Sequence, residues 1–249
     1  MEQLILYTCP FEKERIGKNN DGGYSVAKLP GEYDIFLSGG ISNDITFEID
    51  FLSKNKDLMC YAFDGTVNSL PCSHDRIRFI KKNLGNVNTN DLTNLYDYMK
   101  DYRNIFMKMD IEGHEFVILP TMFENNYIYK VKQLVLEIHS PADIQLYPDY
   151  FKGLSHIKNE NMFNLLKKLN ETHTLIHFHA NNGCKMNKID GINIPHVFEV
   201  TYIRNDFVTE KIKNREPLPT KLDMPNIGDK PEYSLEGFPY STSLSHTFV

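Results

Sequence analysis

Two carboxylates, Asp110 and Glu112, follow directly on the apolar run 106–109. The run predicts a buried strand, and Gly113 predicts a turn into a new helix. Both acids should therefore lie at the carboxyl edge of a parallel sheet, the edge at which open α/β folds bind ligands. Buried anions need a metal, a cation or hydrogen-bond donors, because uncompensated charge is costly. The structural alternative is that the two acids only cap the following helix.

Polar side chains also end two later strand-like runs. Glu137 and His139 share one face of the run around 134–138, because side chains alternate along a strand. His179 ends the next run. Asp110, Glu137 and His139 could together bind a divalent cation such as Mg²⁺ or Mn²⁺. Alternatively, His139 or His179 could act as a general base, with Asp110 in the same catalytic group. The plain alternative for each histidine is a core residue with its hydrogen bonds satisfied.

A glycine turn and a distant acid indicate a nucleoside site. Gly39 and Gly40 follow the apolar run 33–38 and precede a predicted helix over 44–54. Such a turn lets the backbone approach a ligand at the helix N-terminus. Asp64 comes just after the second strand-like run, 58–63. An acid at that point accepts hydrogen bonds from the ribose hydroxyls in nucleoside-binding α/β folds.

Taken in order, these segments resemble S-adenosylmethionine (SAM)-dependent methyltransferases of class I. The stretch 108–115, KMDIEGHE, resembles the K-x-D-x-E-G-x-E motif of FkbM-like methyltransferases. Segments 15–17 with 21–24, 40–44 with 47–48, and 62–66 resemble a related methyltransferase-like family with an R-x-G…DGGY element. The resemblance covers roughly residues 15–204. Ser38 and Ser42 depart from the general SAM loop D/E-x-G-x-G-x-G.

The resemblance implies roles for particular residues. Gly39 and Gly40 would face the cofactor, with Ser42 in the same loop, and Asp64 would bind its ribose. Glu48 would reach toward the methionine end. The implied cofactor-binding set is completed by Asp110, at the end of the fourth strand.

Strand-like runs alternate with helical patterns, which predicts an α/β fold with a doubly wound, mostly parallel, seven-stranded Rossmann-like sheet. Residues 91–102 and 115–125 are predicted helices, and 105–109 is a predicted strand. Only a polar loop, 181–196, joins the last two strands. They should therefore form an antiparallel C-terminal hairpin.

We expect one methyltransferase domain over 1–204 and an extended tail over 205–249. The tail holds five of the twelve prolines and shows no sustained periodicity. Its order should depend on apolar side chains that dock on the domain, among them Leu218 and Phe238.

Composition bounds the class of protein. The 249 residues are 41% hydrophobic and 24% charged, with a net charge of −6. This balance argues against a nucleic-acid partner, which would need a clustered basic face. The four cysteines show no paired spacing, and no segment is long and apolar enough to span a membrane. We therefore expect a soluble, cytoplasmic protein in a reducing compartment, with a small-molecule or glycan acceptor as partner; an oligomer is compatible with the sequence.

The function predicted from these features is SAM-dependent methyl transfer to a hydroxyl, of a sugar or glycan by family analogy. Two rival functions remain open at this stage. One is a metal-dependent hydrolase built on the acids and histidines. The other is a catalytically silent nucleoside-binding module.

Overall fold

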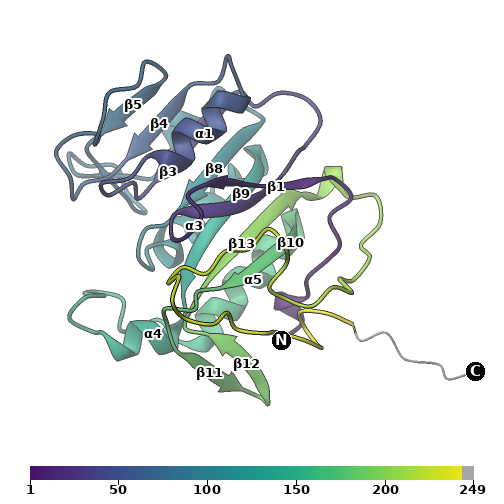
Figure 1. Ribbon diagram of the computed structural model, residues 1–249. Coiled ribbons are helices and arrows are strands. Elements are labelled where there is room, and N and C mark those ends of the chain that lie inside the picture. Colours follow the sequence, from purple (N-terminus) through teal and green to yellow (C-terminus); the bar gives the residue numbers. More distant parts are fainter. Residues whose placement is uncertain (243–249) are drawn as a thin grey trace, which may run out of the picture.

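A computed structural model describes residues 1–242, and its centre is one seven-stranded sheet (Figure 1). The strand order is β10-β13-β9-β8-β3-β4-β5. The last strand in sequence, β13, is antiparallel to both its neighbours, and the other neighbouring pairs are parallel. The predicted fold class is therefore confirmed. The strands are β3 (Ile35–Gly39), β4 (Cys60–Phe63), β5 (Ile77–Ile80), β8 (Ile105–Met109), β9 (Val131–His139), β10 (His173–Ala180) and β13 (Val197–Arg204).

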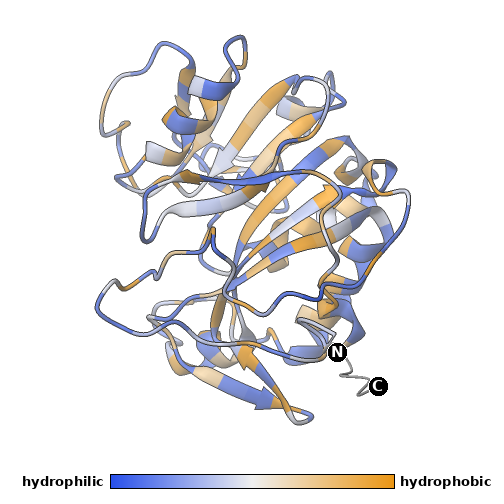
Figure 2. Ribbon diagram, turned by 45° about the vertical axis from the view of Figure 1, so that its right-hand side comes forward, coloured by the Kyte–Doolittle hydropathy of each residue, from blue (hydrophilic) through white to orange (hydrophobic). Residues whose placement is uncertain are grey.

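Successive side chains along each strand point to opposite faces of the sheet, and each face packs in its own hydrophobic core. Ile35 and Leu37 pack with helices α3 (Glu115–Glu124) and α5 (Asn159–Thr172). Phe36 between them points the other way, into a core with α1 (Thr46–Lys54). This is the period-two pattern of a strand that is buried on both faces. The apolar strands stand out against hydrophilic loops in Figure 2.

A β-hairpin that the sequence did not predict covers the α1 face of the sheet. Its strands are β1 (Lys13–Gly17) and β2 (Gly23–Ala27), and β2 is buried along its whole length. In Figure 1 the hairpin runs across the middle of the sheet. The hairpin buries Gly23 and Tyr24 against the sheet, whereas Asp21, in the turn, stays exposed.

The prediction of a helix over 91–102 is wrong for most of these residues. Only α2 (Tyr96–Met99) is helical, and β7 (Leu92–Thr93) pairs with β6 (Asn83–Leu84) before it. The hydroxyl of Thr93 accepts a hydrogen bond from the Leu95 amide, and the side-chain oxygen of Asn94 accepts one from the Tyr96 amide. Such short side-chain bonds to the backbone compete with helix formation.

The polar loop predicted over 181–196 also contains structure. A second small hairpin, β11 (Met186–Ile189) with β12 (Ile192–Pro195), fills most of it. A short helix, α4 (Pro141–Leu146), follows β9. Three short 3₁₀ turns complete the regular structure: η1 (Glu2–Leu4), η2 (Ile128–Lys130) and η3 (Asn205–Phe207).

Beyond η3, the chain runs extended over the domain up to residue 242 (Figure 1, yellow). Leu218 and Leu235 pair by an isolated bridge and are buried, as is Tyr240. The expectation that Phe238 docks is wrong, because its side chain is 52% exposed. Residues 243–249 of the predicted tail lie outside the described residues.

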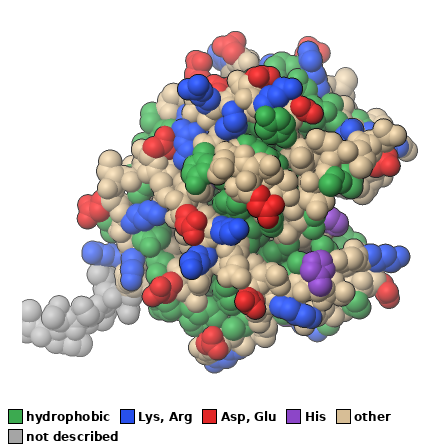
Figure 3. Space-filling view, turned by 180° about the vertical axis from the view of Figure 1, so that it is seen from behind, with side chains coloured by type: hydrophobic (Ala, Val, Ile, Leu, Met, Phe, Trp, Pro, Cys, Tyr) green, Lys and Arg blue, Asp and Glu red, His purple; other side chains and the backbone are tan. Residues whose placement is uncertain are grey.

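Among residues 1–242, the helices are all too short or too polar to cross a bilayer. The four cysteines are free thiols, and Cys60 is buried in β4. The space-filling view from behind shows acidic and basic side chains interspersed, and a deep hollow on one side of the molecule (Figure 3).

Candidate functional site

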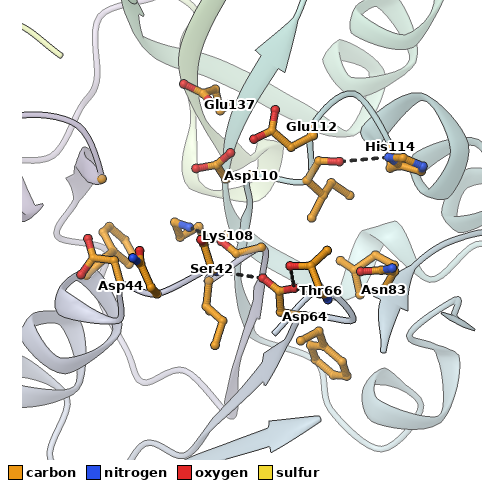
Figure 4. A pocket seen from close by; sticks show the side chains of 18 of the residues that line it. Ser42, Asp44, Asp64, Thr66, Asn83, Lys108, Asp110, Glu112, His114 and Glu137 are labelled. Atoms are coloured by element: carbon orange, nitrogen blue, oxygen red, sulfur yellow. Dashed lines mark hydrogen bonds between the residues drawn. The ribbon is translucent and has the colours of Figure 1, made fainter. Parts of the chain in front are cut away.

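A pocket of about 570 Å³ lies at the carboxyl edge of the parallel strands (Figure 4). The loops that follow β3, β4 and β8 form most of its wall. Seven carboxylates line it, against only two lysines, so the pocket is acidic. The polar lining includes Lys18, Asp21, Ser42, Asp44, Glu48, Asp64, Thr66, Asn83, Lys108, Asp110, Glu112, His114 and Glu137.

Gly40 shapes the loop after β3 and lines the pocket. It has φ +75°, and a β-carbon at this position would lie 1.7 Å from the carbonyl oxygen of Asp110. No side chain fits there, so the loops after β3 and β8 can touch. Gly39 lies beneath, where an added β-carbon would meet Leu84 at 2.5 Å. Close packing, against backbone at Gly40 and against the Leu84 side chain at Gly39, therefore explains both glycines without reference to a ligand.

We expect Gly40→Ala to destabilise the fold by about 2–5 kcal/mol, from left-handed strain plus overpacking. Gly153→Ala is the matched control, because Gly153 has φ +84° with nothing within 4 Å of an added β-carbon. The control should lose only about 1–2 kcal/mol. Urea unfolding of both variants measures the difference. Equal losses would show that the contact with Asp110 does not constrain position 40.

Asp64 follows β4 and points into the pocket, where each of its oxygens is held (Figure 4). One oxygen accepts a hydrogen bond from the Ser42 amide at 2.8 Å, and the other accepts hydrogen bonds from the amide and the hydroxyl of Thr66. Burial alone would raise the pKa of this carboxyl, but the hydrogen bonds outweigh burial and hold its pKa below the ordinary value. Asp64 is therefore a fixed, ionised acceptor.

Glu48 is buried and reaches the pocket from α1. It accepts a hydrogen bond from the Ser38 hydroxyl at 2.5 Å. Burial raises the pKa of Glu48, and the nearby charge of Lys108 opposes that shift. The Lys108 ammonium also donates to the Gly40 carbonyl at 3.3 Å. The strand-end lysine thus holds the glycine turn and the buried acid together.

Asp110 lies at the end of β8 and accepts a hydrogen bond from the Tyr24 phenol at 2.8 Å. Burial and the charge of Asp110 raise the pKa of Tyr24 well above its usual value, so the phenol stays a donor. Sequence reasoning did not single out this hydroxyl, although Tyr24 ends the DGGY element. Asp110, Glu112 and Glu137 project toward one region of the pocket (Figure 4).

His139 lies among three carboxylates. Its Nδ1 is 2.8 Å from Asp143, and its Nε2 is 3.0 Å from Glu112 and 3.5 Å from Glu137. Burial lowers the pKa of the ring, but the three acids outweigh burial and raise the pKa far above 6.5. A ring protonated in this way has no free lone pair with which to accept a proton or ligate a metal. The geometry therefore gives His139 a positioning role.

His179 is similarly enclosed. Its two ring nitrogens are each 3.1 Å from a carboxylate, of Glu199 in β13 and of Glu232 in the tail. Burial lowers the pKa, and these two acids together raise it to about 10. This geometry ties the tail to β10 and keeps the ring protonated at neutral pH. His114, in contrast, is exposed at the pocket rim, with Nδ1 3.2 Å from the Ile111 carbonyl.

Comparisons with known proteins give fold likeness only. No family profile and no curated protein matches the chain. Two solved structures are similar at 10% identity over 71% of this chain. One is the fibrillarin/Nop5p complex, with a TM-score of 0.39 over 74% of that chain. The other is the Methanococcus jannaschii fibrillarin pre-rRNA processing protein, with a TM-score of 0.38 over 69% of that chain.

The comparisons correct the expectation about partners. The sequence predicted a small-molecule or glycan acceptor and no nucleic acid. One neighbour, however, was solved with the protein Nop5p, and the other is described as a pre-rRNA processing protein. We therefore withdraw the exclusion of nucleic acid and the restriction of partners to small molecules and glycans.

Proposed function

We propose that the protein is a SAM-dependent methyltransferase that acts on a hydroxyl group. The observation that carries the proposal is Asp64. Its carboxylate is held ionised at the end of β4, beside the turn after β3. A carboxylate so placed suits the two hydroxyls of a ribose. The stretch 108–115 further supports an FkbM-like relationship.

The rest of the pocket fits the other parts of the same cofactor. Apolar side chains beside Asp64 would hold the adenine ring. Lys18, in the turn between β1 and β2, is 2.7 Å from Asp44, in the loop after β3. Together with buried Glu48 of α1, they line the part of the pocket where the methionine part would lie. The apolar residues in the wall are Ile41, Phe47, Phe63, Leu84, Leu92 and Ile111.

Bound SAM supplies an electrophilic methyl group on a sulfonium, and the protein must align and activate the acceptor. The methyl carbon–oxygen bond forms as the sulfur–carbon bond breaks, and the hydroxyl proton must go to a base. We assign that role to Asp110, whose orientation is fixed by Tyr24. His139, as an imidazolium, would hold Glu112 and Glu137 in place. An acidic wall also suits the positive sulfonium.

We expect Asp64→Ala to weaken SAM binding about tenfold to a hundredfold, because charge-assisted hydrogen bonds to two hydroxyls contribute about 1.5–3 kcal/mol. Calorimetry with SAM and with its demethylated product measures this change. Asp91→Ala is the control, since Asp91 is exposed and outside the pocket wall. Wild-type affinity for SAM in a folded Asp64→Ala variant would show that Asp64 does not bind the cofactor, and the proposal would lose its main support. No binding of SAM to the wild type would overturn the function itself.

A further inference from the structure

Three carboxylates converge next to Asp110, at the end of the pocket formed by β9. Glu137 in β9 and Glu199 in β13 are directly opposite each other in the sheet. Asp21, between β1 and β2, reaches them from above. Each of the three offers an oxygen, and these oxygens lie within 4.8 Å of one another. Like charges directly opposite on neighbouring strands are destabilising unless something compensates them.

Neighbouring groups meet this charge only in part: the Asn181 amide donates to Glu137 at 3.3 Å, and two histidine rings lie beside the acids. His139 lies beside Glu137, but its ring also faces Asp143 and Glu112. His179 lies beside Glu199, but its other nitrogen faces Glu232 in the tail. Each ring is thus shared among two or three acids. Glu137 and Glu199 are only 8% and 4% exposed, so water does little to screen them.

A buried amide on the tail gives a second, independent observation. Asn226 is 6% exposed, and its nitrogen donates to Glu199 at 2.8 Å and to Asp21 at 3.2 Å. Its oxygen is buried and has no hydrogen-bond partner among the described residues. Buried acceptors are rarely left unpaired. A half-turn of the amide would turn this oxygen toward the two carboxylates and the nitrogen away from them, an arrangement that only a cation between the oxygens would favour.

We infer that Asp21, Glu137, Glu199 and Asn226 form a binding site for one hard divalent cation of the Mg²⁺, Mn²⁺ or Ca²⁺ class. Four oxygen donors, three of them from carboxyl groups, are the ligand set that such ions prefer. The cation would offset the opposed charges and give the Asn226 oxygen a partner. It would also join the first hairpin, two central strands and the tail. This set shares only Glu137 with the one predicted from sequence, and it does not depend on SAM binding.

The test uses the full chain, freed of metal by chelation, and Mn²⁺ as the probe. Electron paramagnetic resonance of free Mn²⁺ should show one saturable site per chain, from which Mg²⁺ or Ca²⁺ displaces the probe. Glu199→Gln and Asn226→Leu should each weaken Mn²⁺ binding on the order of tenfold to a hundredfold. Mn²⁺ should also slow proteolysis within residues 208–242, a readout that needs no enzyme activity.

Glu112→Gln is the matched control, because Glu112 is an acid of the same pocket outside the proposed set. Its Mn²⁺ affinity should stay within about threefold of wild type, since the variant loses a nearby charge but no ligand atom. If the buried Glu199→Gln variant does not fold, exposed Asp21→Asn replaces it. No saturable binding in the folded wild type overturns the inference. So does an equal loss in Glu112→Gln, which would indicate diffuse attraction by the acidic pocket. SAM calorimetry on the same sample tests the proposed function separately.

Discussion

Asp110→Asn is expected to lower turnover by roughly 10²–10⁴, the usual scale for acid–base groups, with SAM affinity nearly unchanged. The amide keeps the shape of the side chain but cannot take the acceptor proton. The oxygen that accepts from the Tyr24 phenol is retained, so the loop should keep its position. The loss should therefore fall on the chemical step.

Single-turnover rates and SAM calorimetry on the same preparation separate chemistry from binding. Asp97→Asn makes the same change at an exposed carboxylate that pairs only with Lys100, and it should behave as wild type. Tyr24→Phe should lose less than Asp110→Asn, because Tyr24 acts only through Asp110. An unfolded Asp110→Asn variant would make this carboxylate a structural cap. Full turnover in a folded Asp110→Asn variant would show that Asp110 does not take part in the chemical step.

The fold could be predicted where apolar runs are long and buried on both faces. Ile105–Met109 is a strand as expected, and α3 begins at the predicted residue and ends one residue before the predicted end. Such segments can be recognised from their own residues, because a strand that is buried on both faces is apolar along nearly its whole length. The first hairpin gave no such signal. Its β2 strand reads GYSVA, and its burial comes from packing on distant β9 and β13.

The residues of the candidate site also differ in how far they could be predicted from the sequence. Asp64 and Asp110 could be placed from sequence, because each directly follows a strand and parallel strands end at one edge. The protonation states of His139 and His179 could not. Their partners lie 2 to 53 residues away, and Glu232 comes from the tail. A histidine that looks like a base in the sequence is held as an imidazolium once those acids are folded around it.

The partner prediction failed for a related reason. It used the net charge of −6, which is a property of the whole chain, and the lack of a clustered basic run along the sequence. Partners respond to the local distribution of charge and shape on a surface. The sum over 249 residues leaves that distribution open, so it does not exclude a class of macromolecule.

The second large effect is expected at the tail. Leu218, Leu235 and Tyr240 are buried against the domain, and Asp223 lies 2.7 Å from His177 in β10. Burial lowers the pKa of His177, and Asp223 opposes this shift. The charge of His177 holds the pKa of the Asp223 carboxyl well below its usual range, against the effect of burial. The tail thus contributes both apolar burial and the charged partner of a buried ring.

A chain that ends at Val208 keeps η3 but loses all of these contacts. Each buried apolar side chain contributes about 1.5–3 kcal/mol, so three of them approach the net stability of about 5–15 kcal/mol typical of a whole domain. We expect the shortened chain to bind hydrophobic dyes and to lose its cooperative thermal transition. A chain that ends at Thr242 keeps every contact named here and should melt as the full chain does. A Val208 chain with an unchanged transition and full SAM affinity would show that the domain boundary lies before the tail and that residues 209–242 are dispensable for the fold.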